Sequence, residues 1–386
     1  MPVHDRSPNE PAIDWGLPGS RRPPPPPRPV PMTSSPLPTA GHPMPDSPTV
    51  TVLMPVRNGE ATLARAITSV QAQTSSSWEL LLVDDRSTDD TPQIAAEFAA
   101  ADPRIRVHQT ASPIGDRGLV AALDTGCREA AGRFIARLDA DDECLPDRLA
   151  RQVDLLERTP ELGVVGCLVD FGGDPVAAAG YARHVAWTNS LLDHRSILLN
   201  RFVDSPLPHP SVMFRRDLVE RLGAYRDGPF PEDHELWLRW LDAGVRFGKV
   251  PEVLLRWNDP PDRLSRTDPR YSIEASSRLR CRHLAIDLER RDERRPLWLW
   301  GSGRVTRRRF DTLVEHGISI AGFIDIDSDR IGQRSLGVPV VGPDRLPDPG
   351  DSFILSGVGV RGAREEIRTT LLASGRREGE DFLMMA

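Results

Sequence analysis

The sequence predicts an α/β protein in which a larger domain, built on a parallel sheet, is followed by a second, smaller α/β domain. Between residues 49 and 138, short apolar runs typical of strands alternate with segments of helical periodicity. This alternation favours a parallel sheet with helices on both faces. A second alternation of the same kind begins near residue 296. The 386 residues suffice for two or three domains of ~100–200 residues each.

Apolar runs and their end signals place the elements of the first domain. Strands are expected at 50–55, 78–83, 105–108 and 133–138, and helices at 60–73, from an Asp89 or Asp90 cap to 100, and at 119–131. Pro55 ends the first strand, because proline cannot donate to a central hydrogen-bond ladder. Farther along, strands at 163–169 and 209–214 and helices at 216–222 and 233–243 form a less regular half.

The C-terminal pattern predicts a charged connecting helix followed by a Rossmann-like unit. The helix covers 271–292; strands follow at 297–300, 320–324 and 353–355, and helices at 306–316 and 363–373. We therefore expect a first α/β domain at 49–270, a helical linker at 271–295 and a small Rossmann-like domain at 296–386.

Residues 1–48 are rich in proline, serine and arginine, with five consecutive prolines at 23–27. Such a segment cannot bury enough apolar surface to offset the entropy lost on ordering. We expect a disordered, Pro-rich tail with polyproline II character. A ligand segment for an SH3-type domain is the alternative interpretation.

Composition excludes several classes of protein. The net charge is -7 without a dominant block of like charge, so no nucleic-acid partner is expected. No pair of the four cysteines has C-x-x-C spacing, which argues against a zinc site and fits reduced thiols in a cytosolic protein. No apolar run reaches the ~18 residues that span a bilayer, and the first residues lack the apolar region of a signal peptide. A cytoplasmic location is therefore expected.

Acidic side chains cluster where predicted strands end. Asp84-Asp85 and Asp139-Ala140-Asp141-Asp142 each follow an apolar strand, and Glu232-Asp233 precedes a helix. Ligands of open parallel sheets bind at the carboxyl ends of the strands. Three carboxylates within one turn repel one another unless a cation is present, and hard oxygen ligands suit Mg²⁺ or Mn²⁺ held together with a diphosphate. In the alternative interpretation, Asp142 only caps a helix that starts near Pro146.

Four stretches of the sequence resemble the family 2 glycosyltransferases, which have the GT-A fold. They read VLMPVRNGE at 52–60, LLVDDRSTD at 81–89, ARLDADD at 136–142 with PDRL at 146–149, and EDHELWLRW at 232–240. They occur in the family's order over residues 50 to about 265. The resemblance implies an inverting, metal-dependent transfer of a sugar from a nucleotide-sugar donor to a hydroxyl acceptor. Surface glycan assembly is the implied setting.

The resemblance also implies roles for individual residues. The nucleotide-binding set is Pro55, Val56, Arg57, Glu60, Asp84 or Asp85, and Asp139. Asp139 and Asp141 are the implied ligands of Mg²⁺ or Mn²⁺, with Asp141 as the principal one, and Asp233 is the implied general base. A glycan, a lipid-linked glycan or another hydroxyl compound is the acceptor. Peripheral association with the inner face of the membrane stays open.

Three departures from the family pattern bear on function. Arg57 stands where an aromatic residue is common, although a guanidinium plane can also stack on a base. The box at 236–240 lacks the glutamine of processive relatives, which favours a single transfer. No histidine occurs at 255–261, so Arg256, Arg263 or Arg266 is the candidate cation for the diphosphate. His209 is a further candidate near the acceptor.

The C-terminal unit carries part of a dinucleotide-binding fingerprint. Gly301 and Gly303 follow a strand, Thr306 replaces the third glycine, and Asp325 lies where a ribose-binding acid is expected. A nucleotide-binding, regulatory or homo-oligomerising role is open. Two other functions make different predictions. A nucleotide-sugar oxidoreductase needs a catalytic base that this unit lacks, and a non-catalytic nucleotide-sugar binder predicts loss of Asp141 or Asp233, which are both present.

Overall fold

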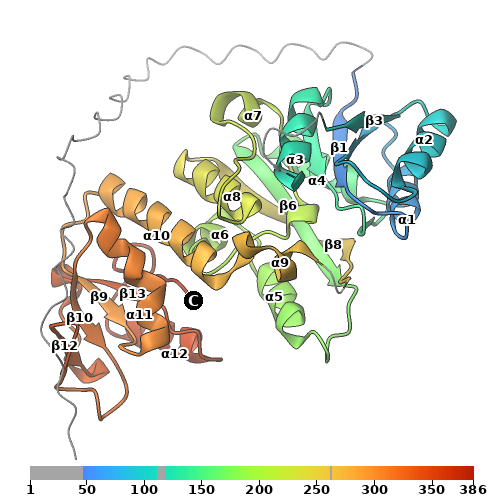
Figure 1. Ribbon diagram of the computed structural model, residues 1–386. Coiled ribbons are helices and arrows are strands. Elements are labelled where there is room, and N and C mark those ends of the chain that lie inside the picture. The colour runs from blue at the N-terminus through green and yellow to red at the C-terminus, as the bar shows by residue number, and fades with distance from the viewer. Residues whose placement is uncertain (1–46, 111–117, 261–262) are drawn as a thin grey trace, which may run out of the picture. The chain divides into compact units, whose positions relative to one another are not determined.

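The computed structural model describes residues 47–110, 118–260 and 263–386 (Figure 1). The expected tail at 1–48 therefore lies outside the described residues, except for its last two positions. All four cysteines are buried and free. Among the described residues, no helix combines the length and the apolar composition needed to cross a bilayer.

The first part of the chain forms a sheet of eight strands in the order β3-β2-β1-β4-β7-β6-β8-β5. Their bounds are β1 (Val50–Val56), β2 (Trp78–Asp84), β3 (Ile105–Gln109), β4 (Phe134–Arg137), β5 (Glu143–Cys144), β6 (Leu162–Phe171), β7 (Met213–Arg215) and β8 (Arg246–Trp257). The first four strands in this order pair in parallel, as the sequence predicts, whereas β7 runs antiparallel to both β4 and β6. The carboxyl ends of β1, β2 and β4 therefore meet at one edge.

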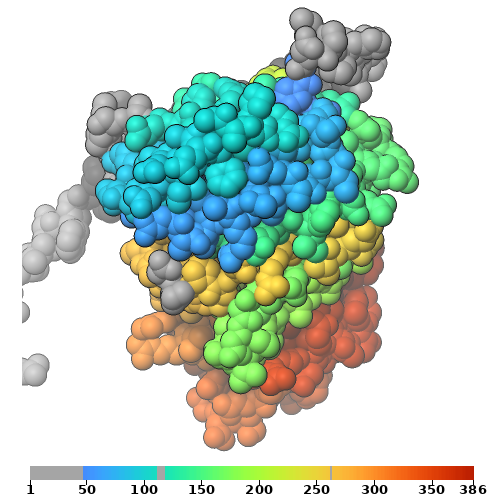
Figure 2. All heavy atoms as spheres, turned by 90° about the vertical axis from the view of Figure 1, so that its right-hand side faces the viewer, coloured from blue at the N-terminus to red at the C-terminus, as the bar shows by residue number. Residues whose placement is uncertain are grey.

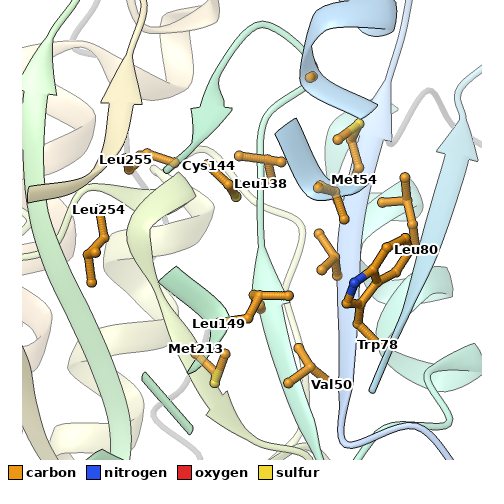
Figure 3. Packing of buried hydrophobic residues seen from close by; sticks show 14 of the residues in the cluster. Val50, Met54, Trp78, Leu80, Leu138, Cys144, Leu149, Met213, Leu254 and Leu255 are labelled. Atoms are coloured by element: carbon orange, nitrogen blue, oxygen red, sulfur yellow. The ribbon is translucent and has the colours of Figure 1, made fainter. Parts of the chain in front are cut away.

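Helices cover both faces of this sheet (Figure 1). They are α1 (Leu63–Gln71), α2 (Thr91–Ala101), α3 (Gly118–Glu129), α4 (Arg148–Arg158), α5 (Ala179–Ser190), α6 (His194–Asn200), α7 (Asp217–Leu222), α8 (Glu232–Asp242) and α9 (Leu264–Thr267). Because strand side chains alternate, Val50, Val52 and Met54 of β1 pack with α1, α2 and α4, and Leu53 packs with α3 and α8. Figure 3 shows part of the first of these two cores.

In the less regular half, one expectation was wrong and one strand was missed. The expected strand at 209–214 begins as a 3₁₀ helix, His209–Ser211, and only Met213–Arg215 is a strand, since Pro210 has no N–H for a ladder. The twelve residues of β8 were not predicted, because Pro251 interrupts the apolar run. The register of β8 against β6 shifts next to this proline, between Val250 and Val253.

The C-terminal part forms a second, smaller sheet in the order β11-β12-β10-β9-β13-β14. The strands are β9 (Leu297–Trp300), β10 (Ile320–Ile324), β11 (Arg334–Ser335), β12 (Val338–Val341), β13 (Phe353–Ser356) and β14 (Phe382–Met384), and the helices are α10 (Ile273–Arg290), α11 (Arg304–Phe310) and α12 (Ala363–Ala373). All pairs except β11 with β12 are parallel, the doubly wound arrangement that the sequence predicts.

A short segment after α6 belongs to the core of the second sheet. Phe202 is fully buried among residues that include Phe310 and Leu383, and Val203 packs with Phe382. The buried guanidinium of Arg280 in α10 donates to the carbonyl of Phe202 at 3.3 Å and ties this segment to the C-terminal strand. Figure 2 shows α5 in light green beside the red C-terminal residues, in keeping with Arg364, which lies 5.7 Å from the Trp187 ring centroid.

Phe202→Ala is expected to lower the free energy of unfolding by about 3–5 kcal/mol, because it removes a large side chain from a packed core. Urea denaturation followed by circular dichroism measures the change. Val360→Ala is the control, since Val360 is 70% exposed and its truncation should cost about 0.5 kcal/mol at most. Equal stability of the two variants would show that the segment adds nothing to the shared core.

Candidate active site

One cavity of about 1010 Å³ opens at the carboxyl edge of β1 and β4. Its walls include seven of the residues that the sequence singled out: Pro55, Val56, Arg57, Asp85, Asp139, Asp141 and Asp233. The structure therefore brings all three acidic clusters to a single space, although they are far apart in the sequence.

Glu60 and Asp84, which the sequence placed in the nucleotide site, are not part of the cavity wall. Asp84 is buried at the end of β2, where one carboxylate oxygen accepts hydrogen bonds from the backbone N–H and the hydroxyl of Ser87. The exposed Glu60 accepts from the backbone N–H of Asp90, just before α2. Both carboxylates stabilise loops beside the site. Of the pair Asp84 and Asp85, the structure points to Asp85.

Asp85 is held rigidly at the inner end of the pocket next to Arg57. Its side chain accepts a 3.0 Å hydrogen bond from the Thr110 hydroxyl, and the other oxygen lies 3.7 Å from the Arg57 guanidinium. Arg57 keeps 53% of its side chain exposed, whereas Asp85 is buried. A fixed acceptor beside an exposed guanidinium plane suits a nucleobase, because the plane can stack and the acid can accept an N–H or ribose O–H.

Asp139, Asp141 and Asp142 form the only group of three or more metal-ligand residue types that the described residues bring together in this way. One carboxylate oxygen from each lies within 4.8 Å of the others. Asn258 fixes the loop, since its backbone N–H donates to Asp142 at 2.8 Å and its amide donates to the Asp141 carbonyl at 2.7 Å. The other Asp142 oxygen, Oδ2, is buried without a hydrogen-bond partner among the described residues.

The charges of this cluster fit a hard divalent cation. Burial and the neighbouring Asp139 raise the pKa of Asp141 to about 6, and burial and both neighbours raise the pKa of Asp142 well above its usual value. Such rises reflect crowded carboxylates in a confined space. A bound cation would relieve the repulsion and use the unpartnered oxygen. The interpretation of Asp142 as a helix cap is wrong, because α4 begins at Arg148 with Asp147 at its cap position.

Asp233 lies in the first turn of α8 and lines the cavity. The Ser205 hydroxyl donates to its carboxylate at 3.1 Å. Burial, followed by the charge of Glu232, raises the pKa of Asp233 to about 7. A carboxylate with this pKa can accept a proton at neutral pH far better than an ordinary aspartate.

Sequence reasoning named Glu232 and His209 but missed their hydrogen-bond partners, two tyrosines. Glu232 accepts a 2.7 Å hydrogen bond from the Tyr271 hydroxyl, and His209 shares a 2.7 Å hydrogen bond with Tyr225. Tyr271 comes from the segment that was predicted to be only a linker. The rarity of tyrosine was the signal that the sequence offered, since the chain has only three. In the structure, Tyr181 and Tyr271 line the cavity and Tyr225 contacts His209.

Of the three candidate cations for a diphosphate, the structure brings Arg263 to the cavity. Its guanidinium lies 4.4 Å from the Trp257 ring centroid and 3.4 Å from Asp259. Arg266 pairs with the same Asp259 outside the cavity wall, and Arg256 lies 4.0 Å from Asp170 on the exposed side of β8.

The residues of the C-terminal fingerprint also lie together. Gly301 has φ of +103°, a backbone conformation that favours glycine. Asp325 accepts hydrogen bonds from the backbone N–H and the hydroxyl of Ser302, and these outweigh burial to lower its pKa. The carboxylate that was expected to bind a ribose therefore accepts hydrogen bonds from the glycine turn itself. Gly303 lies close to the Arg330 guanidinium.

Comparisons with known proteins identify the family of this chain. The model of the family "Glycosyl transferase family 2" matches residues 51–223. EpsE of Bacillus subtilis (strain 168), named as a glycosyltransferase, is 32% identical over 252 residues, which cover 64% of this chain and 86% of EpsE. The chain belongs to glycosyltransferase family 2.

Other relatives of this family 2 glycosyltransferase are also named as glycosyl- or glucosyltransferases. WfgD of Escherichia coli, a UDP-Glc:alpha-D-GlcNAc-diphosphoundecaprenol beta-1,3-glucosyltransferase, is 35% identical over 197 residues, or 50% of this chain and 69% of WfgD. The amylovoran biosynthesis glycosyltransferase AmsE of Erwinia amylovora is 28% identical over 198 residues, with the same two coverages. The solved structure of S. aureus TarS 1-349 with UDP-GlcNAc gives a TM-score of 0.49 at 14% identity, covering 69% of this chain and 72% of TarS 1-349. The larger sheet has the GT-A architecture, and the smaller sheet accompanies it.

Proposed function

We propose that this chain is an inverting glycosyltransferase that uses Mg²⁺ or Mn²⁺ to bind a nucleotide-diphosphate sugar and transfers the sugar to a hydroxyl acceptor. One observation carries the proposal: Asp85, Asp139, Asp141 and Asp233 line one cavity. Its volume of about 1010 Å³ is at the upper end of ligand pockets, which suits a nucleotide sugar and an acceptor together.

The donor occupies the half of the cavity nearest β1 and β4. Arg57 and Asp85 bind the nucleoside, and Asp139, Asp141 and Asp142 hold the cation. The cation, when bound, supplies positive charge to the departing nucleoside diphosphate. Arg263 lies at the same cavity and offers a second cationic contact to the diphosphate.

Asp233 takes the proton from the acceptor hydroxyl. The Ser205 hydroxyl orients its carboxylate, and the raised pKa makes it a competent base near neutrality. As the proton moves to Asp233, the acceptor oxygen attacks the anomeric carbon, and the bond from that carbon to the diphosphate oxygen breaks. Attack from the side opposite the leaving group inverts the anomeric centre.

The acceptor is proposed to be a growing surface glycan carried on a lipid. The name of WfgD specifies a sugar linked to diphosphoundecaprenol as its acceptor. An enzyme with such a substrate works at the membrane surface, so a peripheral position at the inner face is part of the proposal.

A donor screen tests this function. The purified chain is incubated with UDP-, GDP- and dTDP-sugars and Mn²⁺ or Mg²⁺, and the release of nucleoside diphosphate is measured. We expect turnover of one nucleotide class and its loss with EDTA. Thermal stabilisation by NAD alone, without any turnover, would instead support the oxidoreductase interpretation. Metal-dependent binding without turnover in the presence of glycan acceptors would support a non-catalytic binder.

The rate of transfer is expected to rise with pH through about 7. Asp233 acts only when ionised, and its pKa is raised to about 7, so the active fraction falls below this pH by about tenfold per pH unit. An ordinary aspartate near 3.8 would give a flat profile between pH 5.5 and 8.5. Values of kcat/KM, obtained from initial rates across this pH range, distinguish the two cases. A flat profile contradicts the role of a buried, raised base.

A further inference from the structure

The turn at 201–205, which follows α6, contacts the base Asp233 through its last residue. The Ser205 hydroxyl donates to the Asp233 carboxylate at 3.1 Å, and the Leu207 carbonyl is a more distant acceptor for the same proton at 3.4 Å. A hydroxyl has a single proton to donate, so it binds the nearer, charged oxygen. The position of Ser205 therefore determines whether the base receives this hydrogen bond.

A second contact joins the first residue of the turn to the same helix. Nε2 of His234, the residue after Asp233 in α8, donates to the Arg201 carbonyl at 2.8 Å. The Arg201 guanidinium forms a buried ion pair with Asp287 of α10 at 3.0 Å. Both ends of the turn are therefore bonded to the helix that carries the base, and its first residue is also bonded to α10.

Arg280 of α10 fixes the middle of the turn. Its side chain is buried, and its Nη1 donates to three backbone carbonyls, those of Phe202, Val203 and Met385. Met385 directly follows β14, so a single nitrogen joins the turn to the end of the last strand of the second sheet. We call these three hydrogen bonds the Arg280 tether.

The guanidinium of Arg280 is bonded entirely to neutral acceptors. Its other nitrogens donate to the Ser276 carbonyl at 3.1 Å and to the Ser277 hydroxyl at 3.3 Å, and in the part of the chain that the structure describes it forms no ion pair. Burial lowers its pKa, which reflects the cost of a charge removed from water. The hydrogen bonds offset this cost, and they hold the carbonyls of the turn in place.

The turn is separate from the donor half of the cavity. Arg57, Asp85 and the loop at 139–142 lie at the carboxyl ends of the first sheet, and no hydrogen bond or ion pair joins them to the turn at 201–205 within the described ranges. A displaced turn should therefore disturb the base and leave the donor site intact.

We propose that Arg280 is a positioning residue for sugar transfer. By tying the turn at 201–205 to the last strand, it keeps Ser205 where its hydroxyl orients the Asp233 carboxylate. The second sheet thereby supports the acceptor side of the active site, a role that requires no nucleotide at Gly301 and Gly303. The inference rests on the proposed function, because Asp233 acts as a base only in transfer.

Loss of the tether should change the base in a known direction. Burial and the charge of Glu232 raise the pKa of Asp233 to about 7, whereas the hydrogen bond from Ser205 favours the ionised carboxylate and lowers it. Without this bond the pKa rises further, so the pH at which transfer is half-maximal moves upward. The other titratable groups near Asp233 are unchanged in the variants below: Asp204, Tyr225, His234 and Tyr271.

Arg280→Met removes the donors and keeps a long apolar side chain. We expect kcat at pH 7 to fall roughly tenfold and the pH midpoint to rise by roughly one unit, while binding of the nucleoside diphosphate with Mn²⁺ changes by about twofold at most. Ser205→Ala should produce the same effects, since it removes the hydroxyl itself. Arg282→Met, an exposed arginine of the same helix, is the control and should match wild type.

The double variant Arg280→Met with Ser205→Ala identifies the route of the effect. If Arg280 acts through Ser205, the double variant is no slower than Ser205→Ala and has the same pH midpoint. Additive losses, or an unchanged midpoint in Arg280→Met, would leave Arg280 a stabilising residue and overturn the proposal. Phe202→Leu loosens the turn from the second core without changing a charge, and it decides the question by the same criteria if Arg280→Met does not fold.

Hydrogen–deuterium exchange gives a readout that needs no substrate. Arg280→Met, or Phe202→Leu in its place, should increase exchange of the amides at 203–205 and leave those at 139–142 unchanged. Unchanged exchange in the turn would show that the tether does not hold it. Wild-type protein without transfer from any donor contradicts the proposed function, whereas active wild-type protein with unaffected variants contradicts only the role of Arg280.

Discussion

Asp233→Asn is expected to slow sugar transfer by roughly 10²–10⁴-fold, because it removes the general base but keeps the shape of the side chain. The amide can still accept from the Ser205 hydroxyl, so the local fold should persist. Binding of the nucleoside diphosphate with Mn²⁺ should change little, since the metal cluster is built from other residues. Transfer rates and diphosphate affinity, measured on the same preparation, check both statements.

Asp217→Asn is the matched control for this variant. Asp217 starts α7, is about half exposed, and forms an ion pair with Arg221 four residues later. Its loss should leave transfer within about twofold of wild type, because exposed ion pairs contribute little. If Asp233→Asn retains wild-type transfer, another group must take the proton and the proposed mechanism is wrong.

Asp141→Asn is expected to weaken metal-dependent binding of the nucleoside diphosphate by roughly a hundredfold or more. Even the loss of a residue that only hydrogen-bonds to a metal ligand typically lowers metal affinity about 10–100-fold. The substitution also removes one of three crowded charges, so the protein without metal should become somewhat more stable. Opposite shifts in metal-dependent binding and in metal-free stability are the signature of a cation site. Calorimetry with Mn²⁺ and thermal unfolding in EDTA measure the two quantities.

Asp154→Asn is the control for the metal site. Asp154 lies on α4 with 44% of its side chain exposed, and it pairs only with Arg158 among the contacts that the described residues form. It should change neither diphosphate affinity nor its dependence on metal. Diphosphate binding by Asp141→Asn that equals wild type and ignores EDTA would remove the basis for a cation in this cavity.

The fold was predictable where local pattern determines structure. β1, β9 and β10 were placed to within a residue, because each is a continuous apolar run with a clear end signal. β8 was missed because Pro251 interrupts its apolar run in the sequence. The strand forms through its pairing with β6, which the local pattern does not show. The α5 and α6 helices were also missed, since their segment lacks a strong apolar stripe.

The candidate site was predictable in part for a related reason. The carboxyl ends of parallel strands share an edge, so acids after β2 and β4 could be expected to converge. The choice between Asp84 and Asp85 depends on which way each side chain points at the strand end, and composition does not contain this information. Tyr271 and Arg263 come from segments far along the chain, and only tertiary packing brings them to the cavity.

The packing of Phe202 and Val203 against the last strands also has a consequence for biosynthesis. Phe382 lies roughly 180 residues after Phe202 in the sequence. At about 5–20 residues per second, a ribosome needs on the order of ten to forty seconds to make this stretch. During this time Phe202 and Val203, next to Ser205, lack the residues of the last strands against which they pack. The nascent chain therefore exposes these apolar side chains to solvent. We therefore expect the segment that carries Ser205 to reach its final packing only after β14 has emerged.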